Sequence, residues 1–107
     1  SADIYLNKDE LDIYKLQNTK VLHFGSLSLV NKTYEESTLL AIKIAKENKA
    51  IISYDPNYRP LLWNNEQEAI EMMCRYLHLV DILKISLDEL YLMDIDLCLY
   101  KDICIVY

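Results

Sequence analysis

The sequence predicts an α/β fold, in which parallel strands are joined by crossover helices. Three short apolar runs, at residues 20–24, 50–54 and 82–85, recur at intervals of about thirty residues, which is typical of βαβ units. Consecutive crossovers of this kind are right-handed and build a parallel sheet. Because the apolar runs show little alternation, we expect helices on both faces of the sheet, in three layers.

The helices follow from caps and apolar stripes between these strands. A short helix is expected at residues 9–15, before the first strand. After that strand, Thr33-Tyr34-Glu35-Glu36 matches a capping box, and an apolar stripe follows it at helical spacing: Leu39, Ala41, Ile42, Ile44 and Ala45. After the second strand, Asn65-Glu66-Gln67-Glu68 can cap a second helix, whose inward residues are Ala69, Ile70, Met73 and Leu77. The sequence leaves open whether residues 102–107 form a strand.

Length, charge and cysteine content limit the classes of function that are possible for this chain. A chain of 107 residues predicts one domain. The net charge of -6 comes without a basic stripe, which argues against nucleic-acid binding. No apolar run approaches the ~18 residues of a membrane span, and no signal peptide opens the chain. Cys74, Cys98 and Cys104 lack metal-type spacing, so we expect buried free thiols and a cytoplasmic location.

The single glycine, Gly25, restricts how the chain could handle a nucleotide. Phosphate-cradling loops need several glycines, so neither GxGxxG nor GxxxxGK[ST] exists here. An anion hole for ATP would have to come from residues outside this sequence. His23 and His78 are isolated, and His23 is expected to be a hydrogen-bonded core or edge histidine.

Polar groups follow each of the predicted strands. Gly25-Ser26, Asp55-Pro56-Asn57 and Ser86-Leu87-Asp88-Glu89 occupy these positions. Ligands of open α/β sheets bind at the carboxyl edge of the strands. We therefore expect these three groups to converge on one ligand-binding edge.

Each of these groups admits a structural and a functional interpretation. In residues 55–63, Asp55 and Asn57 could satisfy turn backbone, or Arg59 could bind phosphate or carboxylate on a loop made rigid by proline. Ser86-x-x-Glu89 is a capping box, although Glu89 could also lie near a hydrated Mg²⁺ and Ser86 near phosphates. Lys84 could run its stem along apolar surface or pair with a nucleotide phosphate.

Residues 21 to about 92 resemble the middle of a ribokinase-like (PfkB) carbohydrate kinase, especially the fructokinases. The most specific match is the run Asp-Pro-Asn-Tyr-Arg-Pro-Leu-Leu-Trp at 55–63, and further matches lie at 23–29, 45–46 and 81–90. The resemblance implies a ribokinase-like three-layer sheet of which residues 1–107 form a single partial domain, the central βαβαβ portion. Residues 93–107 depart from the family pattern.

The resemblance also implies site residues, a reaction and ligands. Asp55, Asn57 and Arg59 would serve the substrate and phosphate side, and Lys84, Ser86 and Glu89 the Mg²⁺ and nucleotide phosphates, with Glu89 contacting the metal through water. The implied reaction is ATP-dependent phosphorylation of a sugar hydroxyl, typically of fructose. The family's catalytic base belongs to a Gly-Ala-Gly-Asp motif that this sequence lacks, so no catalytic residue is assigned and we expect the isolated chain to be inactive.

Two alternatives to a fructokinase-like fragment stay open. One is a kinase for another sugar or sugar acid, such as ribose or 2-keto-3-deoxygluconate. The other is a non-catalytic α/β remnant or interaction module. Its exposed sheet edges would favour oligomerisation.

Overall fold

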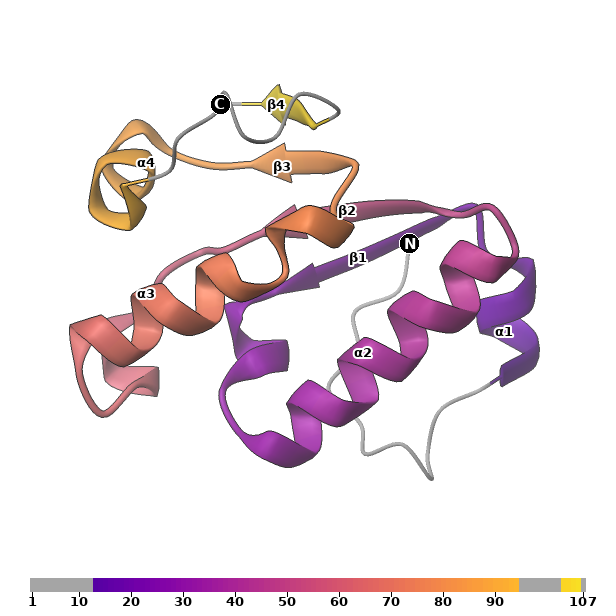
Figure 1. The fold of residues 1–107 in the computed structure, drawn as a ribbon, viewed down its shortest axis with the longest axis horizontal. Coiled ribbons are helices and arrows are strands. Elements are labelled where there is room, and N and C mark those ends of the chain that lie inside the picture. Colours follow the sequence, from indigo (N-terminus) through magenta and orange to yellow (C-terminus); the bar gives the residue numbers. More distant parts are fainter. Residues whose placement is uncertain (1–12, 95–102, 107) are drawn as a thin grey trace.

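The protein forms a parallel four-stranded sheet with helices between the strands. The computed structural model describes residues 13–94 and 103–106. The strands are β1 (Val21–Gly25), β2 (Ile51–Asp55), β3 (Ile82–Lys84) and β4 (Cys104–Val106), and they lie side by side in that order. All neighbouring pairs are parallel, which confirms the predicted fold class (Figure 1).

The described residues also form four α-helices and three 3₁₀ helices, of which the first α-helix precedes β1 and the others lie between the strands. The α-helices are α1 (Ile13–Asn18), α2 (Lys32–Glu47), α3 (Glu66–Arg75) and α4 (Leu87–Met93). The 3₁₀ helices are η2 (Ser26–Leu29), η3 (Pro60–Leu62) and η4 (Leu77–Leu79). The helix expected at 9–15 overlaps α1 at residues 13–15, and its residues 9–12 lie outside the described residues. The tail forms a strand, β4, which pairs with β3.

The core lies between one face of the sheet and helices α2 and α3. Each of the first three strands contributes its alternate residues to this face, and α2 and α3 contribute their apolar stripes. The ring of Tyr54 stacks on that of Phe24 with centroids 4.4 Å apart. The Tyr54 hydroxyl donates to the Met73 carbonyl at 2.9 Å. That carbonyl lies in the last turn of α3, where helical carbonyls lack intrahelical partners.

The second face of the sheet lies opposite the side that packs against α2 and α3. Its described side chains alternate along each strand with those of the core face, and they are half-buried or exposed. His23 and Ser53 are neighbours on this face, and His23 Nδ1 lies 3.0 Å from Ser53 Oγ. The expectation that His23 is hydrogen-bonded is therefore confirmed. Lys84 lies on the same face and is exposed.

Helix caps agree with the sequence in two cases and correct it in a third. Asn65 caps α3 by accepting from the Glu68 amide at 2.7 Å, and Ser86 and Glu89 form the expected capping box of α4. The predicted box beginning at Thr33 is wrong, since Asn31 caps α2 and accepts from the Tyr34 amide at 2.9 Å. An asparagine in extended conformation is at least as good a cap as threonine, and Asn31 lies two residues before Thr33.

The cysteines are less buried than expected. Cys74 is half-buried, and its Sγ lies 3.8 Å from the Met93 carbonyl oxygen, whereas Cys104 is exposed on the edge strand β4. Both are free thiols. Cys98 lies outside the described residues. Among the helices of the described ranges, none has the length and apolar character needed to cross a membrane.

Candidate active site

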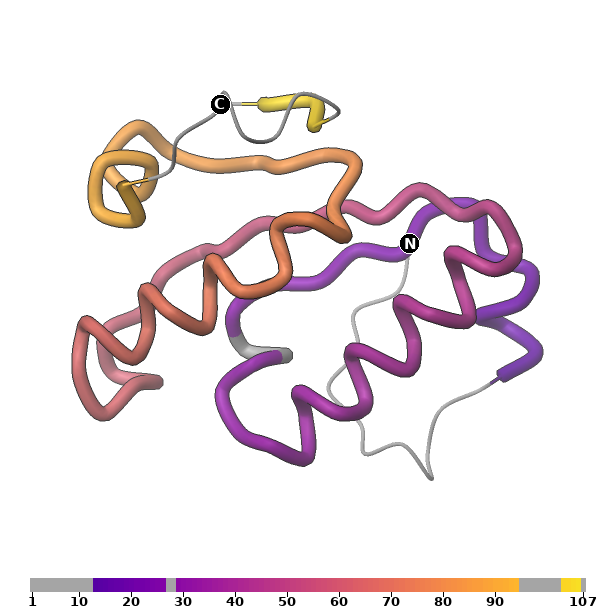
Figure 2. The backbone as a smooth tube through the Cα atoms, in the orientation of Figure 1, coloured from indigo at the N-terminus to yellow at the C-terminus, as the bar shows by residue number. Residues whose placement is uncertain are grey.

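The ends of β1, β2 and β3 meet at one edge of the sheet, as the sequence predicts. Gly25 is the register partner of Asp55, and Tyr54 that of Leu83. Beyond the strands, the Ser26 amide donates to the Pro56 carbonyl at 3.2 Å, and Ser26 Oγ donates to the Asn57 carbonyl at 3.3 Å. Figure 2 shows the backbone leaving β2 towards α3 and leaving β3 into α4 at the same end of the sheet.

Gly25 allows the first two strand ends to approach closely. A Cβ atom at this position would lie 2.9 Å from the Asp55 carbonyl oxygen. Since that oxygen belongs to the backbone, a side chain could be accommodated only by separating β1 from β2. The glycine thus keeps Ser26 within hydrogen-bond distance of the loop after β2.

The loop after β2 carries three of the predicted site residues. Asp55 is half-buried at the strand end, and Pro56 is buried beside it. Asn57 has a φ of 43°, a left-handed conformation that asparagine tolerates better than most residues. Arg59 is exposed and extended, immediately before η3. Its guanidinium is therefore available to a ligand at this edge.

Glu89 joins the β2 loop to the start of α4. Its Oε2 accepts from the Tyr58 amide at 2.7 Å, while its Oε1 accepts from the Ser86 amide at 3.0 Å and the Ser86 hydroxyl at 3.1 Å. Ser86 Oγ in turn accepts from the Glu89 amide at 3.1 Å. The structural interpretation of Ser86 and Glu89 as a capping box is confirmed. Through Glu89, the start of α4 is also hydrogen-bonded to the β2 loop.

Lys84 is the predicted site residue that this network does not include. It occupies the last position of β3, where it pairs with Val106 of β4, and its side chain is exposed on the second sheet face. Within the described part of the chain, no hydrogen bond connects it to Ser86 or Glu89. The strand alternation thus places Lys84 at the edge of the site.

Tyr54, the residue before Asp55 in β2, is a buried neighbour of the site that was not identified from the sequence. Its complete burial, reinforced by the charges of Cys74, Glu89 and Asp55, raises the pKa of Tyr54 well above its ordinary value of 10.0. The phenol is therefore neutral at physiological pH and acts as a hydrogen-bond donor inside the core. A tyrosine in an apolar strand carries no sequence signal for this arrangement.

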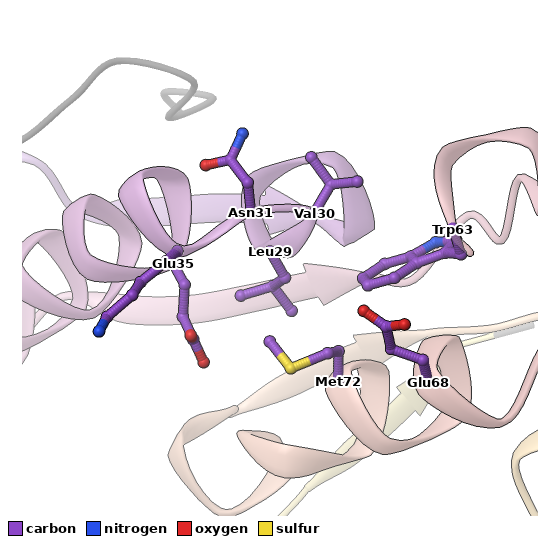
Figure 3. A pocket seen from close by; sticks show the side chains of 8 residues that line it. Leu29, Val30, Asn31, Glu35, Trp63, Glu68 and Met72 are labelled. Carbon is purple, nitrogen blue, oxygen red and sulfur yellow. The ribbon is translucent and has the colours of Figure 1, made fainter. Parts of the chain in front are cut away.

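A separate pocket lies between the starts of α2 and α3. It has a volume of about 190 Å³, and Figure 3 shows the indole of Trp63, the carboxylate of Glu68 and the side chains of Leu29 and Met72 around it. The indole Nε1 of Trp63 is buried and has no hydrogen-bond partner among the described residues. None of the six predicted site residues lines this pocket.

Magnesium coordination can be tested against the donors at the edge of the sheet. Within residues 13–94 and 103–106, no cluster of three or more His, Cys, Asp or Glu side chains could hold a metal ion. The Oε1 atom of Glu89 already accepts two hydrogen bonds and Oε2 accepts one. A carboxylate offers about four acceptor positions, so one remains on Oε2. This fits contact with a metal-bound water better than direct ligation.

A parallel α/β sheet with polar loops converging at its carboxyl edge defines a class of ligand-binding domains that includes many nucleotide-dependent enzymes. Residues 1–94 match the model of the pfkB family carbohydrate kinases, and the chain belongs to this family.

The relatives include plant fructokinases and bacterial kinases of known structure. The chain is 41% identical over 90 residues to "Probable fructokinase-7" of Arabidopsis thaliana, covering 84% of this chain and 26% of that protein. It resembles the fructokinase of Xylella fastidiosa with bound ATP, with a TM-score of 0.75 and 27% identity over 87% of this chain and 29% of the other. A PfkB family carbohydrate kinase of Listeria grayi shares the fold, with a TM-score of 0.79, 23% identity, and 94% and 35% of the two chains covered. The chain thus spans about a quarter to a third of these relatives.

Proposed function

We propose that this chain is the central segment of an ATP-dependent sugar kinase whose acceptor is fructose. The observation that carries the proposal is the hydrogen-bonded convergence of the Ser26, Asn57 and Glu89 segments at one sheet edge. Family membership supplies the reaction class, and the relatives named fructokinase supply the acceptor. The free thiols Cys74 and Cys104 support a cytoplasmic location.

The residues at the edge divide the work of phosphoryl transfer between them. Asp55, Asn57 and Arg59 serve the sugar and the transferred phosphate, since an exposed guanidinium can bind phosphate oxygens with two parallel hydrogen bonds. Ser86 and Glu89 serve the nucleotide phosphates and a hydrated Mg²⁺, which would neutralise charge on the transferred group. Lys84 contributes positive charge from the second sheet face.

The chain alone is proposed to bind Mg·ATP without turning it over. Phosphoryl transfer needs a base positioned at the attacking hydroxyl, and the Gly-Ala-Gly-Asp motif that supplies it in this family is not among the 107 residues. Losing such a group together with an anion hole removes several kcal/mol of transition-state stabilisation. The exposed edge strand β4 further supports association with other copies or with the rest of a kinase domain.

Calorimetric titration of the 107-residue chain with Mg·ATP tests the binding proposal. We expect a dissociation constant in the millimolar range or below, and a rise of about tenfold on Arg59→Ala because a charge-assisted contact is lost. Lys43→Ala is the matched control, since Lys43 is an exposed cation on α2, away from the sheet edge. The absence of binding at millimolar Mg·ATP would contradict the proposal and favour a non-catalytic α/β segment.

A coupled assay with fructose, ribose and 2-keto-3-deoxygluconate tests turnover and acceptor. We expect no ATP-dependent phosphorylation by the isolated chain with any of the three. A solved relative named 2-dehydro-3-deoxygluconokinase, 25% identical to this chain, keeps a sugar acid as the second candidate acceptor. Phosphorylation of fructose by the purified chain would show that the missing motif is not required.

A further inference from the structure

The hydrogen bonds of Glu89 exceed what a capping box requires. A capping box needs one carboxylate oxygen to accept from the N-cap amide, and Glu89 Oε1 does this with Ser86. The other oxygen, Oε2, accepts from the Tyr58 amide, which lies 31 residues away in sequence and on another strand's loop. At 2.7 Å this is the shorter of the two contacts. The second bond does not serve the helix.

The Tyr58 amide is the point at which Glu89 holds the β2 loop. Tyr58 stands between the two loop residues proposed to serve the acceptor side, Asn57 and Arg59. On the β1 side, the same loop is held by Ser26, which donates to the carbonyls of Pro56 and Asn57. The loop is therefore fixed from both neighbouring strands. The hydrogen bond from the Tyr58 amide to Glu89 holds the loop on the β3 side, where the nucleotide is proposed to bind.

The acceptor positions of the Glu89 carboxylate link the nucleotide side of the site to the β2 loop. Oε1 accepts two hydrogen bonds from Ser86 and is saturated, since each carboxylate oxygen offers about two positions. The position left open is on Oε2, the atom that holds Tyr58. A metal-bound water or a phosphate-bound water that reaches Glu89 must therefore share an oxygen with the β2 loop.

We infer that Glu89 is a positioning residue, whose Oε2 holds the Asn57–Arg59 loop and transmits occupancy of the nucleotide side to it. The inference builds on the proposed function, because it assigns regulation of that same site. A ligand that polarises or competes for Oε2 changes the hydrogen bond to the Tyr58 amide. The loop that presents Asn57 and Arg59 to the acceptor then shifts with nucleotide occupancy.

Amide hydrogen exchange of the ¹⁵N-labelled chain tests the fixation without any ligand. In Glu89→Gln one oxygen becomes an NH₂ group, so the side chain can cap α4 or accept from Tyr58 but not both, and glutamine still suits a capping box. We expect the Tyr58 amide to exchange at least about tenfold faster in this variant. Asp88→Asn, which neutralises the adjacent exposed carboxylate, should leave Tyr58 unchanged.

A second variant separates positioning from fraying of α4. Ser86→Ala removes the capping hydroxyl but leaves the Glu89–Tyr58 bond possible. We expect Tyr58 protection to persist within about threefold in this variant. Equal loss of protection in Ser86→Ala and Glu89→Gln would show that helix fraying controls the loop, and it would overturn the inference. Unchanged exchange in Glu89→Gln would overturn it as well.

Titration with Mg²⁺ and a non-hydrolysable ATP analogue tests the transmission. In the wild-type chain we expect the Asn57 and Arg59 resonances to shift with the same apparent affinity as Ser86. In Glu89→Gln the Ser86 shift should remain, whereas the Asn57 and Arg59 shifts should fall by at least about half. Retention of the loop shifts in Glu89→Gln overturns the inference. If the wild-type chain shows no shift at all, the proposed function fails, and the exchange of Tyr58 alone decides whether Glu89 positions the loop.

Discussion

Replacing Asp81 with alanine is expected to weaken the junction between three strands. The Asp81 carboxylate accepts from the Ile52 amide at 2.8 Å, just before β3 begins. Its backbone amide donates to the Ile52 carbonyl, and its carbonyl accepts from the Cys104 amide, both at 2.8 Å. The side chain therefore supplies the ladder bond at a point where β2 has no backbone acceptor from β3. The substitution removes that acceptor and leaves the backbone bonds possible.

The magnitude follows from the burial of the orphaned donor. Ile52 has no exposed surface, so water cannot readily replace the lost acceptor. An unsatisfied buried amide costs about 1–3 kcal/mol, and Asp81 itself is only half-buried, so little apolar burial changes. We therefore expect Asp81→Ala to lower the free energy of unfolding by about 2 kcal/mol. Asp81→Asn keeps one acceptor oxygen and should lose about half as much.

Urea unfolding, followed by Trp63 fluorescence and by circular dichroism, measures the effect. With an m-value of about 2 kcal/mol/M, the midpoint of Asp81→Ala should fall by about 1 M with m unchanged. Glu71→Ala removes an exposed carboxylate of α3 and should stay within about 0.5 kcal/mol of wild type. An Asp81→Ala variant as stable as Glu71→Ala would refute the assignment of Asp81 as the missing ladder acceptor.

Three further changes probe the core, the close strand approach and a cap. Tyr54→Phe should cost about 1–2 kcal/mol at neutral pH, because the Met73 carbonyl loses its donor. Burial raises the pKa of Tyr54 above 10.0, so the Tyr54 hydroxyl ionises at a lower pH in the unfolded chain than in the folded one. In urea unfolding measured at a series of pH values, wild-type stability should therefore decline more steeply above pH 10 than that of the phenylalanine variant. Parallel declines would contradict this. Gly25→Ala should lower the free energy of unfolding by about 1–3 kcal/mol because its Cβ would press on the Asp55 carbonyl, and a variant of wild-type or greater stability would show that the strands can separate freely. Asn65→Ala should cost about 1 kcal/mol through the lost cap of α3; an unchanged thermal midpoint would exclude a stabilising role for this cap.

Several features of the fold could be predicted because they depend on neighbours in the chain. The apolar stripe of α2, the Asn65 cap and the Ser86-x-x-Glu89 box act over three or four residues. The strands at 21–25 and 51–55 agree with the apolar runs to within one residue. The error in the α2 cap is also local: Asn31, two residues before Thr33, caps the helix by accepting from the Tyr34 amide.

The location of the site could be predicted from the sequence, but its hydrogen bonds could not. Parallel strands bring their carboxyl ends together, so the positions of Asn57 and Ser86 followed from the βα period. The bond between Tyr58 and Glu89 did not follow, because it uses a backbone amide, which is present at every residue and carries no sequence signal. The same holds for the ladder bond from Ile52 to Asp81.

Residue order alone was therefore sufficient for the α/β class, the first three strands and the edge at which polar groups gather, since periodicity and caps are properties of short segments. The assembled sheet assigned His23, Ser53 and Lys84 to one half-exposed face, and it gave Glu89 a partner 31 residues away. Such contacts form only when separate segments pack against each other, because they depend on strand register and loop geometry, which no short window of the chain specifies.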